Sequence, residues 1–320
     1  MPLSTSIAVC TYNGERFLQE QLDSLLAQTQ LPDQIVLRDD VSSDRTVEIL
    51  RAFVPTAEAL GIAVDLQVNP RNVGYRCNFD GALRACTGEV IFLCDQDDVW
   101  HANKLARMCA EFDVRPGLLA LHTDARLIDG DGTVLPRSLF RSLGIGRREL
   151  RHMQRGDALA LLLKRVMITG ATMALRRQVL LDALPLPESG WVHDAWIGTL
   201  AATRGQVSTL PEALVDYRLH SNNQLGLGGN DPLPRHERRM RQLEVERIQC
   251  DQLLERARYL GIAEHVLNLF QQKRSHVMSR AALGPHRLRR IPTVFAEVVA
   301  GNYQRYGRGL LSAGIDLIRR

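Results

Sequence analysis

Short apolar runs alternate with segments of helical periodicity through the first third of the chain. The runs predict strands at residues 6–10, 34–38, 63–68 and 90–94. Between them, apolar side chains recur every three or four residues, which predicts helices over 17–26, 44–57, 79–85 and 102–112, with Ser43 capping the second. Strands that alternate with helices predict an α/β fold: a mostly parallel sheet flanked by helices.

The pattern is less regular in the middle of the chain and wholly helical towards its end. It predicts a strand over 118–123 and 125–128 followed by a hairpin turn, and then a mobile loop at 144–156. After that loop it predicts a strand at 168–175, a helix at 192–202, and short strands at 207–210 and 213–218. A flexible link at 225–231 precedes a basic helical tail that starts at Pro234. The predicted domains are 1–228, with halves at 1–115 and 116–228, and a helical C-terminal region at 229–320.

Charge is distributed unevenly between these regions. Residues 231–320 hold 17 Lys and Arg against 9 Asp and Glu, whereas residues 1–230 hold 23 against 27. The net charge of +4 is too small to indicate nucleic acid, so we expect no nucleic-acid partner. The basic tail and the more acidic remainder are expected to serve different purposes.

Three features of the sequence bear on the cellular compartment. The six cysteines include no C-x-x-C pair, and the start MPLSTSIAVC lacks the basic segment of a secretory signal. No apolar stretch reaches the length that spans a bilayer. These features predict a cytoplasmic protein with reduced thiols.

Polar clusters follow each of the first four predicted strands. They lie at residues 11–14, 39–44, 69–74 and 95–98. The carboxyl ends of parallel strands meet at one edge of a sheet, where ligands of such folds bind. The sequence therefore predicts a ligand site formed by these four clusters.

The cluster after the fourth strand holds three carboxylates, Asp95, Asp97 and Asp98. Two carboxylates about 5 Å apart at an effective dielectric near 20 repel by roughly 3 kcal/mol. A cation, a shared proton or exposure to water would offset this repulsion. The D-x-D spacing fits Mg²⁺ or Mn²⁺ held by one or two carboxylates and the phosphates of a ligand, and an ordinary surface turn is the alternative.

The remaining clusters offer candidates for binding and catalysis, each with a structural alternative. Asp39 and Asp40 can accept a hydrogen bond from a base or a ribose, or they can order a turn. Asp194, in WVHDAW, has apolar neighbours that would raise its pKa and suit a general base, or it caps the following helix. His220 is a metal ligand or a polar loop residue.

Seven segments in order and spacing resemble the family 2 glycosyltransferases, which have a GT-A fold. They are AVCTYNGERFLQEQLDSLLAQT, VLRDDVSSDRT, NPRNVGYRCNFDGAL, TGEVIFLCDQDDVW, ITGATMAL, WVHDAWIG and YRLHSNNQLG. The resemblance covers about residues 4–226. The DQDDVW and YR-x-H-x-NN details look most like the bacterial rhamnosyltransferase-like branch, which builds surface polysaccharides.

The resemblance implies an inverting transferase that moves a sugar from a nucleotide-diphosphate donor, dTDP-rhamnose or a UDP-sugar, to a glycan or lipid-linked acceptor. It implies that the nucleotide-binding residues are Thr11, Tyr12, Glu15 and Asp39, with Asp39 on the base and Asp40 beside it, and that Arg76 lies near the phosphates or sugar. Asp95 and Asp97 would form the D-x-D motif, and Asp97 and His220 would bind Mg²⁺ or Mn²⁺. Asp194 would be the catalytic base. The family usually places an acid before that base, and here it is His193.

The basic tail has two interpretations, a helical cap over the sheet or attachment to an anionic membrane where lipid-linked acceptors reside. The second rests on Arg287, Arg289 and Arg290 beside Ile291, Val294, Phe295 and Val298. Three other functions compete with the transferase. They are a D-x-D phosphatase of the haloacid dehalogenase class, a sugar nucleotidyltransferase, and a non-catalytic sugar-nucleotide-binding scaffold.

Overall fold

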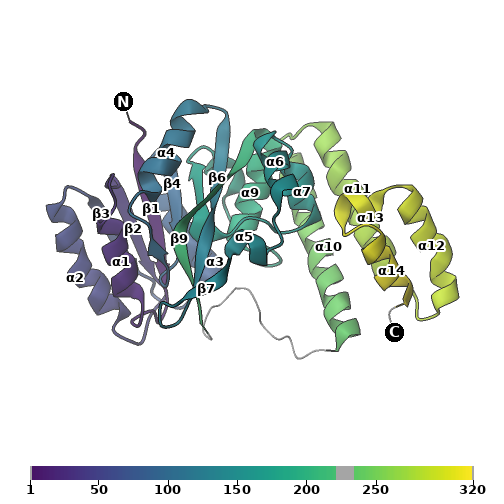
Figure 1. Cartoon of the computed structure of the whole chain (residues 1–320), viewed down its shortest axis with the longest axis horizontal. Helices are drawn as coiled ribbons and strands as arrows, with labels where there is room; N and C mark the ends of the chain where they lie inside the picture. Colours follow the sequence, from purple (N-terminus) through teal and green to yellow (C-terminus); the bar gives the residue numbers. More distant parts are fainter. Residues whose placement is uncertain (1, 221–233, 319–320) are drawn as a thin grey trace. The chain divides into compact units, whose positions relative to one another are not determined.

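The structure is a computed structural model that describes residues 2–220 and 234–318 (Figure 1). The described chain forms two compact units. Unit 1 comprises residues 2–158, 167–188 and 192–220, and unit 2 comprises residues 159–166, 189–191 and 234–318. Each unit has its own interior and is described separately.

Unit 1 is built on a nine-stranded sheet of order β3-β2-β1-β4-β8-β6-β9-β5, with β7 paired to β6 (Figure 1). Its first four strands are parallel: β1 (Thr5–Thr11), β2 (Gln34–Asp39), β3 (Ala63–Val68) and β4 (Val90–Cys94). The helices that follow them are α1 (Leu18–Leu26), α2 (Thr46–Ala59), α3 (Tyr75–Ala85) and α4 (Lys104–Val114). This is the alternating α/β pattern that the sequence predicts.

Burial explains the parallel half of the sheet. Every residue of β1 and β4 is buried, as expected for central parallel strands covered on both faces. Helix α1 buries Leu18, Leu22 and Leu25, which lie on one face at helical spacing. Packing of such helix faces onto the sheet fixes the register that brings the strand ends together.

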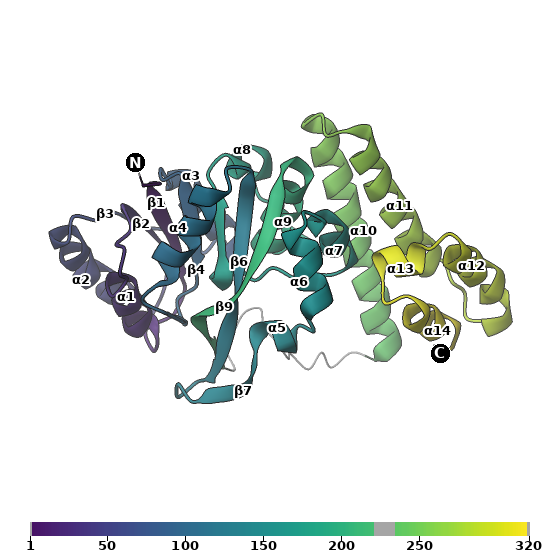
Figure 2. The same cartoon turned by 45° about the horizontal axis from the view of Figure 1, so that its top comes forward.

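The other half of the sheet combines two long strands, β6 and β9, with three short ones. They are β5 (Val99–Trp100), β6 (Leu118–Asp129), β7 (Val134–Ser138), β8 (Met173–Arg176) and β9 (Gln206–Leu219). Figure 2 shows β6 and β9 side by side, and their pairing is parallel. The prediction of two short strands at 207–210 and 213–218 is wrong, because β9 continues through a register shift that leaves Pro211 and Glu212 out of the ladder. Proline has no N–H to donate there. Strand β6 spans both predicted apolar runs, and the predicted hairpin turn connects it to β7.

Three other predictions are corrected. The segment predicted as a mobile loop at 144–156 contains α6 (Arg147–Gln154), whose start is capped because the Gly146 N–H donates to Glu149 Oε2 at 3.0 Å. Ser43 does not cap α2; Asp44 Oδ1 accepts from the Thr46 N–H at 3.0 Å instead. The strand predicted from 168 starts at Met173, after the 3₁₀ turn η1 (Gly170–Thr172). The remaining helices of this region are α5 (Leu139–Ser142), α7 (Ala158–Lys164), α8 (Val179–Ala183) and α9 (His193–Arg204).

Unit 2 is helical from Arg235 onward, as the sequence predicts. Its helices are α10 (Arg235–Tyr259), α11 (Glu264–Ala281), α12 (Arg287–Val299), α13 (Asn302–Tyr306) and α14 (Leu310–Ile318). Helices α10 and α11 pack together as a hairpin (Figure 2). The predicted link at 225–231 lies outside the described residues. Within the described ranges, no helix combines the length and apolar character needed to cross a bilayer.

The interior of unit 2 holds paired charges. Asp316 accepts from Arg280 Nε at 2.6 Å and from the Tyr303 hydroxyl at 3.0 Å, and its side chain is fully buried. Buried His276 lies with Nδ1 2.5 Å from Glu297 Oε2. These contacts tie α11 to α12, α13 and α14. Opposite charges therefore supplement a small apolar core around Val294.

Candidate active site

The polar clusters after β1, β2, β3 and β4 meet at one edge of the sheet. The parallel register places Thr11 beside Asp39 and Asp39 beside Val68, so the three strands end together. Hydrogen bonds then join the loops: the Tyr12 N–H donates to Gln96 Oε1 and the Asn13 N–H donates to Ser42 Oγ, both at 2.8 Å. The predicted convergence of these strand ends is confirmed.

Most residues that the resemblance places at the nucleotide also organise these loops. Buried Asp39 accepts from Thr11 Oγ1 at 2.8 Å and from the Ser42 N–H at 2.9 Å. Glu15 Oε2 accepts from the Arg45 N–H at 3.0 Å. Tyr12, by contrast, is 38% exposed and available to a ligand. Thr11 and Asp39 therefore form a buried, hydrogen-bonded part of the predicted nucleotide site.

Asp40 performs the turn chemistry that is the structural alternative for this position. Its carboxylate accepts from the backbone N–H groups of Val73 and Gly74 at 2.8 Å each, and from Asn69 Nδ2 at 2.9 Å. Gly74 has a φ of 81°, a left-handed conformation that favours glycine, and α3 starts at the next residue. Arg76 lies in this first turn of α3, with its guanidinium over the Tyr75 ring at 5.3 Å. Asp40 therefore fixes the position of Arg76.

The three carboxylates after β4 have different surroundings. Asp97 Oδ2 lies 2.8 Å from His220 Nε2, and both side chains are only slightly exposed. Asp98 is buried, and its Oδ1 accepts from the Arg218 N–H at 3.0 Å. Burial, and then the charges of Asp97 and Asp194, raise the pKa of Asp95 to about 7. Burial and its aspartate neighbours also raise the pKa of Asp98.

Arg218, which the sequence analysis missed, supports this loop from β9. Its Nε donates to the Asp97 carbonyl oxygen at 2.8 Å and its Nη2 donates to Glu20 Oε2 at 2.6 Å. The guanidinium is buried, 4.6 Å from the centre of the Phe17 ring. An arginine in an otherwise buried strand was the available signal, because charged side chains are seldom buried without partners.

A divalent cation fits the Asp97 and His220 pair. A carboxylate oxygen and an imidazole nitrogen are donors that Mn²⁺ accepts, and Mg²⁺ is usually held by one or two carboxylates with phosphates and water. In the part of the chain that the structure describes, no three His, Cys, Asp or Glu side chains are grouped to hold a metal. Two protein ligands leave the other coordination positions to the phosphates of a ligand.

Lys104 is a second cation that the sequence analysis missed. It is fully buried at the start of α4, and its Nζ donates to the Ala171 carbonyl oxygen at 2.7 Å and lies 3.4 Å from the centre of the Trp100 ring. Burial lowers its pKa to about 7, although Cys94, Asp98 and Asp95 oppose that shift. The sequence held one signal of this burial. Lys104 lies four residues before Met108, and this spacing places it on the apolar face of α4.

Asp194 is held in the first turn of α9 by two backbone groups. Its Oδ2 accepts from the Gly170 N–H and its Oδ1 from the Ala195 N–H, both at 2.6 Å. Burial raises the pKa of Asp194 to about 6, against the lowering effect of these N–H donors. At neutral pH the carboxylate is therefore ionised but basic enough to accept a proton.

His193 is a packing residue. Its ring stacks on Phe79 with centroids 4.0 Å apart, and burial lowers its pKa to about 3, so it is neutral. A β-carbon at Gly170 would lie 3.0 Å from His193 Nε2, so a larger residue in this turn would crowd the imidazole ring. The residue before Asp194 therefore supplies no second acid, and Asp194 is the ionisable group at the start of α9.

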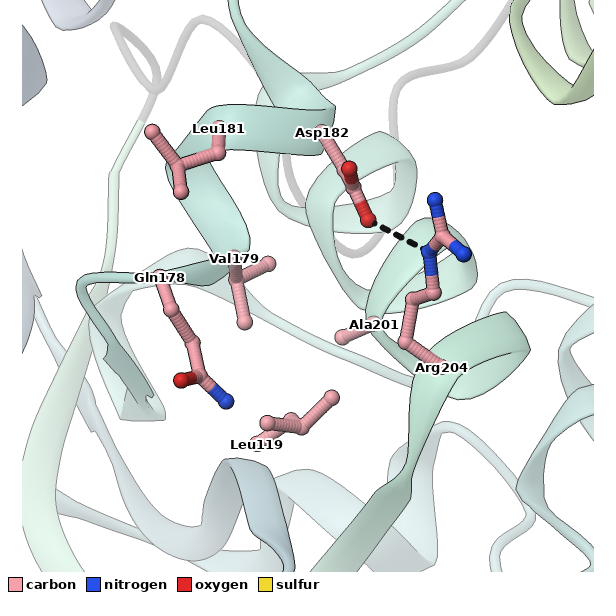
Figure 3. A pocket seen from close by; sticks show the side chains of 7 residues that line it. All are labelled: Leu119, Gln178, Val179, Leu181, Asp182, Ala201 and Arg204. Carbon is pink, nitrogen blue, oxygen red and sulfur yellow. Dashed lines mark hydrogen bonds and ion pairs between the residues drawn. The ribbon is translucent and has the colours of Figure 1, made fainter. Parts of the chain in front are cut away.

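A cavity of about 250 Å³ lies elsewhere in unit 1 (Figure 3). It is lined by Leu119, Gln178, Val179, Leu181, Asp182, Ala201 and Arg204, and the ion pair between Asp182 and Arg204 measures 2.8 Å. Leu119 lies at the start of β6, so the cavity is at the opposite edge of the sheet from the carboxylates. It takes no part in the site described above.

Comparison with known proteins identifies the family. The model of glycosyl transferase family 2 matches residues 6–183, which is more than half of the chain. The chain belongs to glycosyl transferase family 2. This family 2 glycosyltransferase is 30% identical over 222 residues to the protein Rv1520 of Mycobacterium tuberculosis, an alignment that covers 68% of this chain and 59% of that relative.

Solved structures confirm the fold of this glycosyltransferase. The structure of Staphylococcus aureus TarS 1–349 in complex with UDP-GlcNAc has a TM-score of 0.58 at 18% identity and covers 93% of this chain and 81% of that one. The mannosyltransferase PcManGT from Pyrobaculum calidifontis, in complex with GDP-Man and Mn²⁺, has a TM-score of 0.55 at 17% identity over 99% and 84%. The predicted family and GT-A fold with a helical C-terminal region are confirmed, and the rhamnosyltransferase-like branch is not specifically shown.

Proposed function

We propose that this family 2 glycosyltransferase transfers a sugar from a pyrimidine-nucleotide-diphosphate donor, with inversion, to a hydroxyl of a glycan or lipid-linked acceptor in bacterial surface polysaccharide synthesis. The observation that carries the proposal is the arrangement at the strand ends, where Asp97 pairs with His220 and the charge of Asp194 acts on Asp95. The donor candidates are dTDP-rhamnose and a UDP-sugar. TarS, solved with UDP-GlcNAc, supports the second.

Asp194 is the proposed catalytic base. With a pKa of about 6 it is ionised at neutral pH and can take the proton of an acceptor hydroxyl. The hydroxyl oxygen then forms the new bond to the anomeric carbon as the bond from that carbon to the diphosphate oxygen breaks. Because attack comes from the face opposite the diphosphate, the configuration at the anomeric carbon inverts.

The strand-end loops bind the donor in this proposal. Asp97 and His220 would hold Mg²⁺ or Mn²⁺, and a bound divalent ion neutralises charge on a leaving diphosphate. Thr11, Tyr12, Glu15 and Asp39 would surround the nucleotide, and Asp40 would keep Arg76 beside the phosphates or the sugar. Asp95 would face the donor at the edge of the D-x-D loop. We place the reaction in the cytoplasm, a location consistent with six free thiols.

Calorimetric titration with UDP, dTDP, GDP and ADP, each with and without Mn²⁺, tests the donor site. We expect metal-dependent binding of one pyrimidine diphosphate. Asp97→Ala should abolish the metal dependence, whereas Asp182→Ala, which alters an ion pair at the opposite edge of the sheet, should leave it unchanged. Failure of the folded protein to bind any of the four nucleotides at millimolar concentration contradicts the proposal.

Turnover separates the transferase from its remaining rival, the non-catalytic scaffold. With the nucleotide known, the matching sugar donors are incubated with the protein, and release of the nucleoside diphosphate is measured with and without a chelator. Release that needs the divalent ion supports the transferase. Tight nucleotide binding with no release, for every matching donor and with lipid-linked acceptor extract present, supports the scaffold.

A further inference from the structure

Helix α12 presents an apolar stripe to solvent. Leu288, Ile291, Phe295 and Val299 are 79%, 49%, 67% and 71% exposed and recur every three or four residues, so they lie on one face. The opposite face packs inward through Arg290 and Val294, which are buried. Helix α12 therefore exposes four large apolar side chains to solvent.

This stripe differs from the apolar set that the sequence analysis selected. Of that set, Val294 belongs to the core of unit 2 and Val298 packs against that core. Arg290 also points inward, where its Nε donates to the Gly284 carbonyl oxygen at 2.6 Å and its Nη1 donates to the Asp316 carbonyl oxygen at 3.1 Å. Ile291 and Phe295 remain outside, joined by Leu288 and Val299.

Helix α14 carries a second exposed stripe. Leu311, Ile315 and Ile318 are 59%, 44% and 66% exposed at spacings of four and three residues, and Leu310 beside them is 66% exposed. Helices α12 and α14 pack together around Val294, Tyr303 and Ala313. The two stripes thus belong to one small helical assembly, and we name their exposed apolar residues, taken together, the outer face of α12 and α14. These residues are Leu288, Ile291, Phe295 and Val299 on α12, and Leu310, Leu311, Ile315 and Ile318 on α14.

The charges around this face have one sign. Arg287 and Arg289 stand on either side of Leu288, about 100° to each side of the stripe, and both are exposed. Arg308, also exposed, precedes α14. Between residues 287 and 318 the acidic residues are Glu297 and Asp316, and their carboxylates bind His276 and Arg280 inside unit 2. The outer face therefore offers arginines without carboxylates.

We propose that the outer face of α12 and α14 docks onto an anionic lipid bilayer. Apolar side chains that enter the acyl boundary, flanked by arginines at the level of anionic head groups, are the pattern of a helix that lies in a membrane interface. A second copy of this chain is a poorer occupant, because it would bring arginines against arginines with no acid to pair them. The proposal concerns unit 2 alone and does not depend on the donor site.

Co-sedimentation of the full chain with lipid vesicles tests the proposal. We expect binding to vesicles of phosphatidylcholine and phosphatidylglycerol, weak binding to phosphatidylcholine alone, and release by salt. Ile291→Ser with Phe295→Ser should lower the partition coefficient at least about tenfold. Arg287→Gln and Arg289→Gln should each lower it about fivefold on anionic vesicles. Tyr259→Ser, at an 85% exposed position on α10, is the matched control and should bind like the wild type.

Three results overturn the proposal: no sedimentation of the wild type with anionic vesicles, sedimentation of the double serine variant equal to that of the wild type, or equal binding to neutral and anionic vesicles. A dimer in solution that the double serine variant dissociates, without vesicle binding, assigns the face to a second copy instead. Nucleotide titration of the same variants should match the wild type, so loss of membrane binding is distinguished from failure of the donor site.

Discussion

The two units bury charge in opposite ways. In unit 1, Asp95 and Asp98 lie close to Asp97, and burial together with like charge raises the pKa of both. In unit 2, the buried Asp316 carboxylate faces the Arg280 guanidinium, and buried His276 is hydrogen-bonded to Glu297. Like-charged carboxylates therefore lie close together in the strand-end site of unit 1, whereas the buried carboxylate Asp316 of unit 2 is paired with an arginine.

This difference indicates which buried charges serve the fold. Removing one member of a matched buried pair leaves an uncompensated charge and destabilises a protein strongly. Removing one member of a repelling cluster relieves the repulsion and stabilises the protein, and function is the usual reason that such clusters persist. Substitution of a carboxylate in the repelling cluster of unit 1 and substitution of Asp316 in unit 2 should therefore change stability with opposite signs.

The largest effect is expected at Asp194. Asp194→Asn cannot accept a proton from the acceptor, so we expect turnover to fall at least about 10³-fold. In the wild type, turnover should fall as pH drops below about 6, because the base becomes protonated. Steady-state kinetics across pH measure the turnover of Asp194→Asn and the pH dependence of the wild type, with Asp182→Asn as the control. Near-wild-type turnover of Asp194→Asn would show that another group is the base.

The largest stability change is expected in unit 2. Asp316→Asn leaves the Arg280 guanidinium buried without its anion and should lower the free energy of unfolding by about 3 kcal/mol or more. Asp251→Asn is the comparison, because that carboxylate also binds two arginines but is 37% exposed. It should cost less than about 1 kcal/mol. Denaturant unfolding of the full chain measures both, and similar losses would contradict the matched-pair interpretation.

Lys104 is, with Arg218, a cation buried near the repelling carboxylates of unit 1. It is a positioning residue, because its hydrogen bond holds the turn whose Gly170 N–H binds Asp194. Lys104→Met should lower kcat by about tenfold to a hundredfold. Nucleotide affinity should change much less. Lys164→Met, at an exposed lysine, should alter neither. Equal losses of affinity and kcat would indicate a general structural defect instead.

The smallest effect, and the one with the opposite sign, is expected at Asp95. Its pKa of about 7 lies above the usual value of 3.8, so the folded chain binds the proton more tightly than the unfolded chain. Stability should therefore fall as pH rises from about 4 to 7. Asp95→Asn should raise the free energy of unfolding by about 1–2 kcal/mol at pH 8 and by almost nothing at pH 4. Melting curves in chelator without nucleotide check this, and a destabilised variant at pH 8 would refute it.

The sequence predicted the parallel half of the sheet well because its strands are short, apolar and bounded by polar loops. The predicted strands at 63–68 and 90–94 coincide with β3 and β4. It failed where local chemistry and tertiary pairing disagree. Pro211 indicates a break, yet β9 passes through it because β6 pairs with both sides. Glycine and arginine suggest a loop at 144–156, yet Glu149 caps a helix there.

The site was predicted in part for the same reason. Strand-end positions follow from topology, so the convergence of the Thr11, Asp39 and Asp95 loops could be anticipated. The burial of Lys104 and Arg218 had a signal in the sequence, but their roles did not, because both donate to backbone oxygens, of Ala171 and Asp97, which no side-chain motif reveals. The neutral state of His193 likewise follows from its burial, which tertiary packing sets and the local sequence does not reveal.

The hydrogen bond from Lys104 to Ala171 also bears on recombination between related enzymes. Its donor lies before residue 115 and its acceptor after it, so a chimera joined there takes the two ends of the bond from different parents. The acceptor is a backbone oxygen, which any residue at 171 provides if the Gly170–Thr172 turn keeps its shape. For this bond, a crossover therefore needs an incoming segment that carries that turn intact together with the start of α9, and it does not need a particular residue at 171.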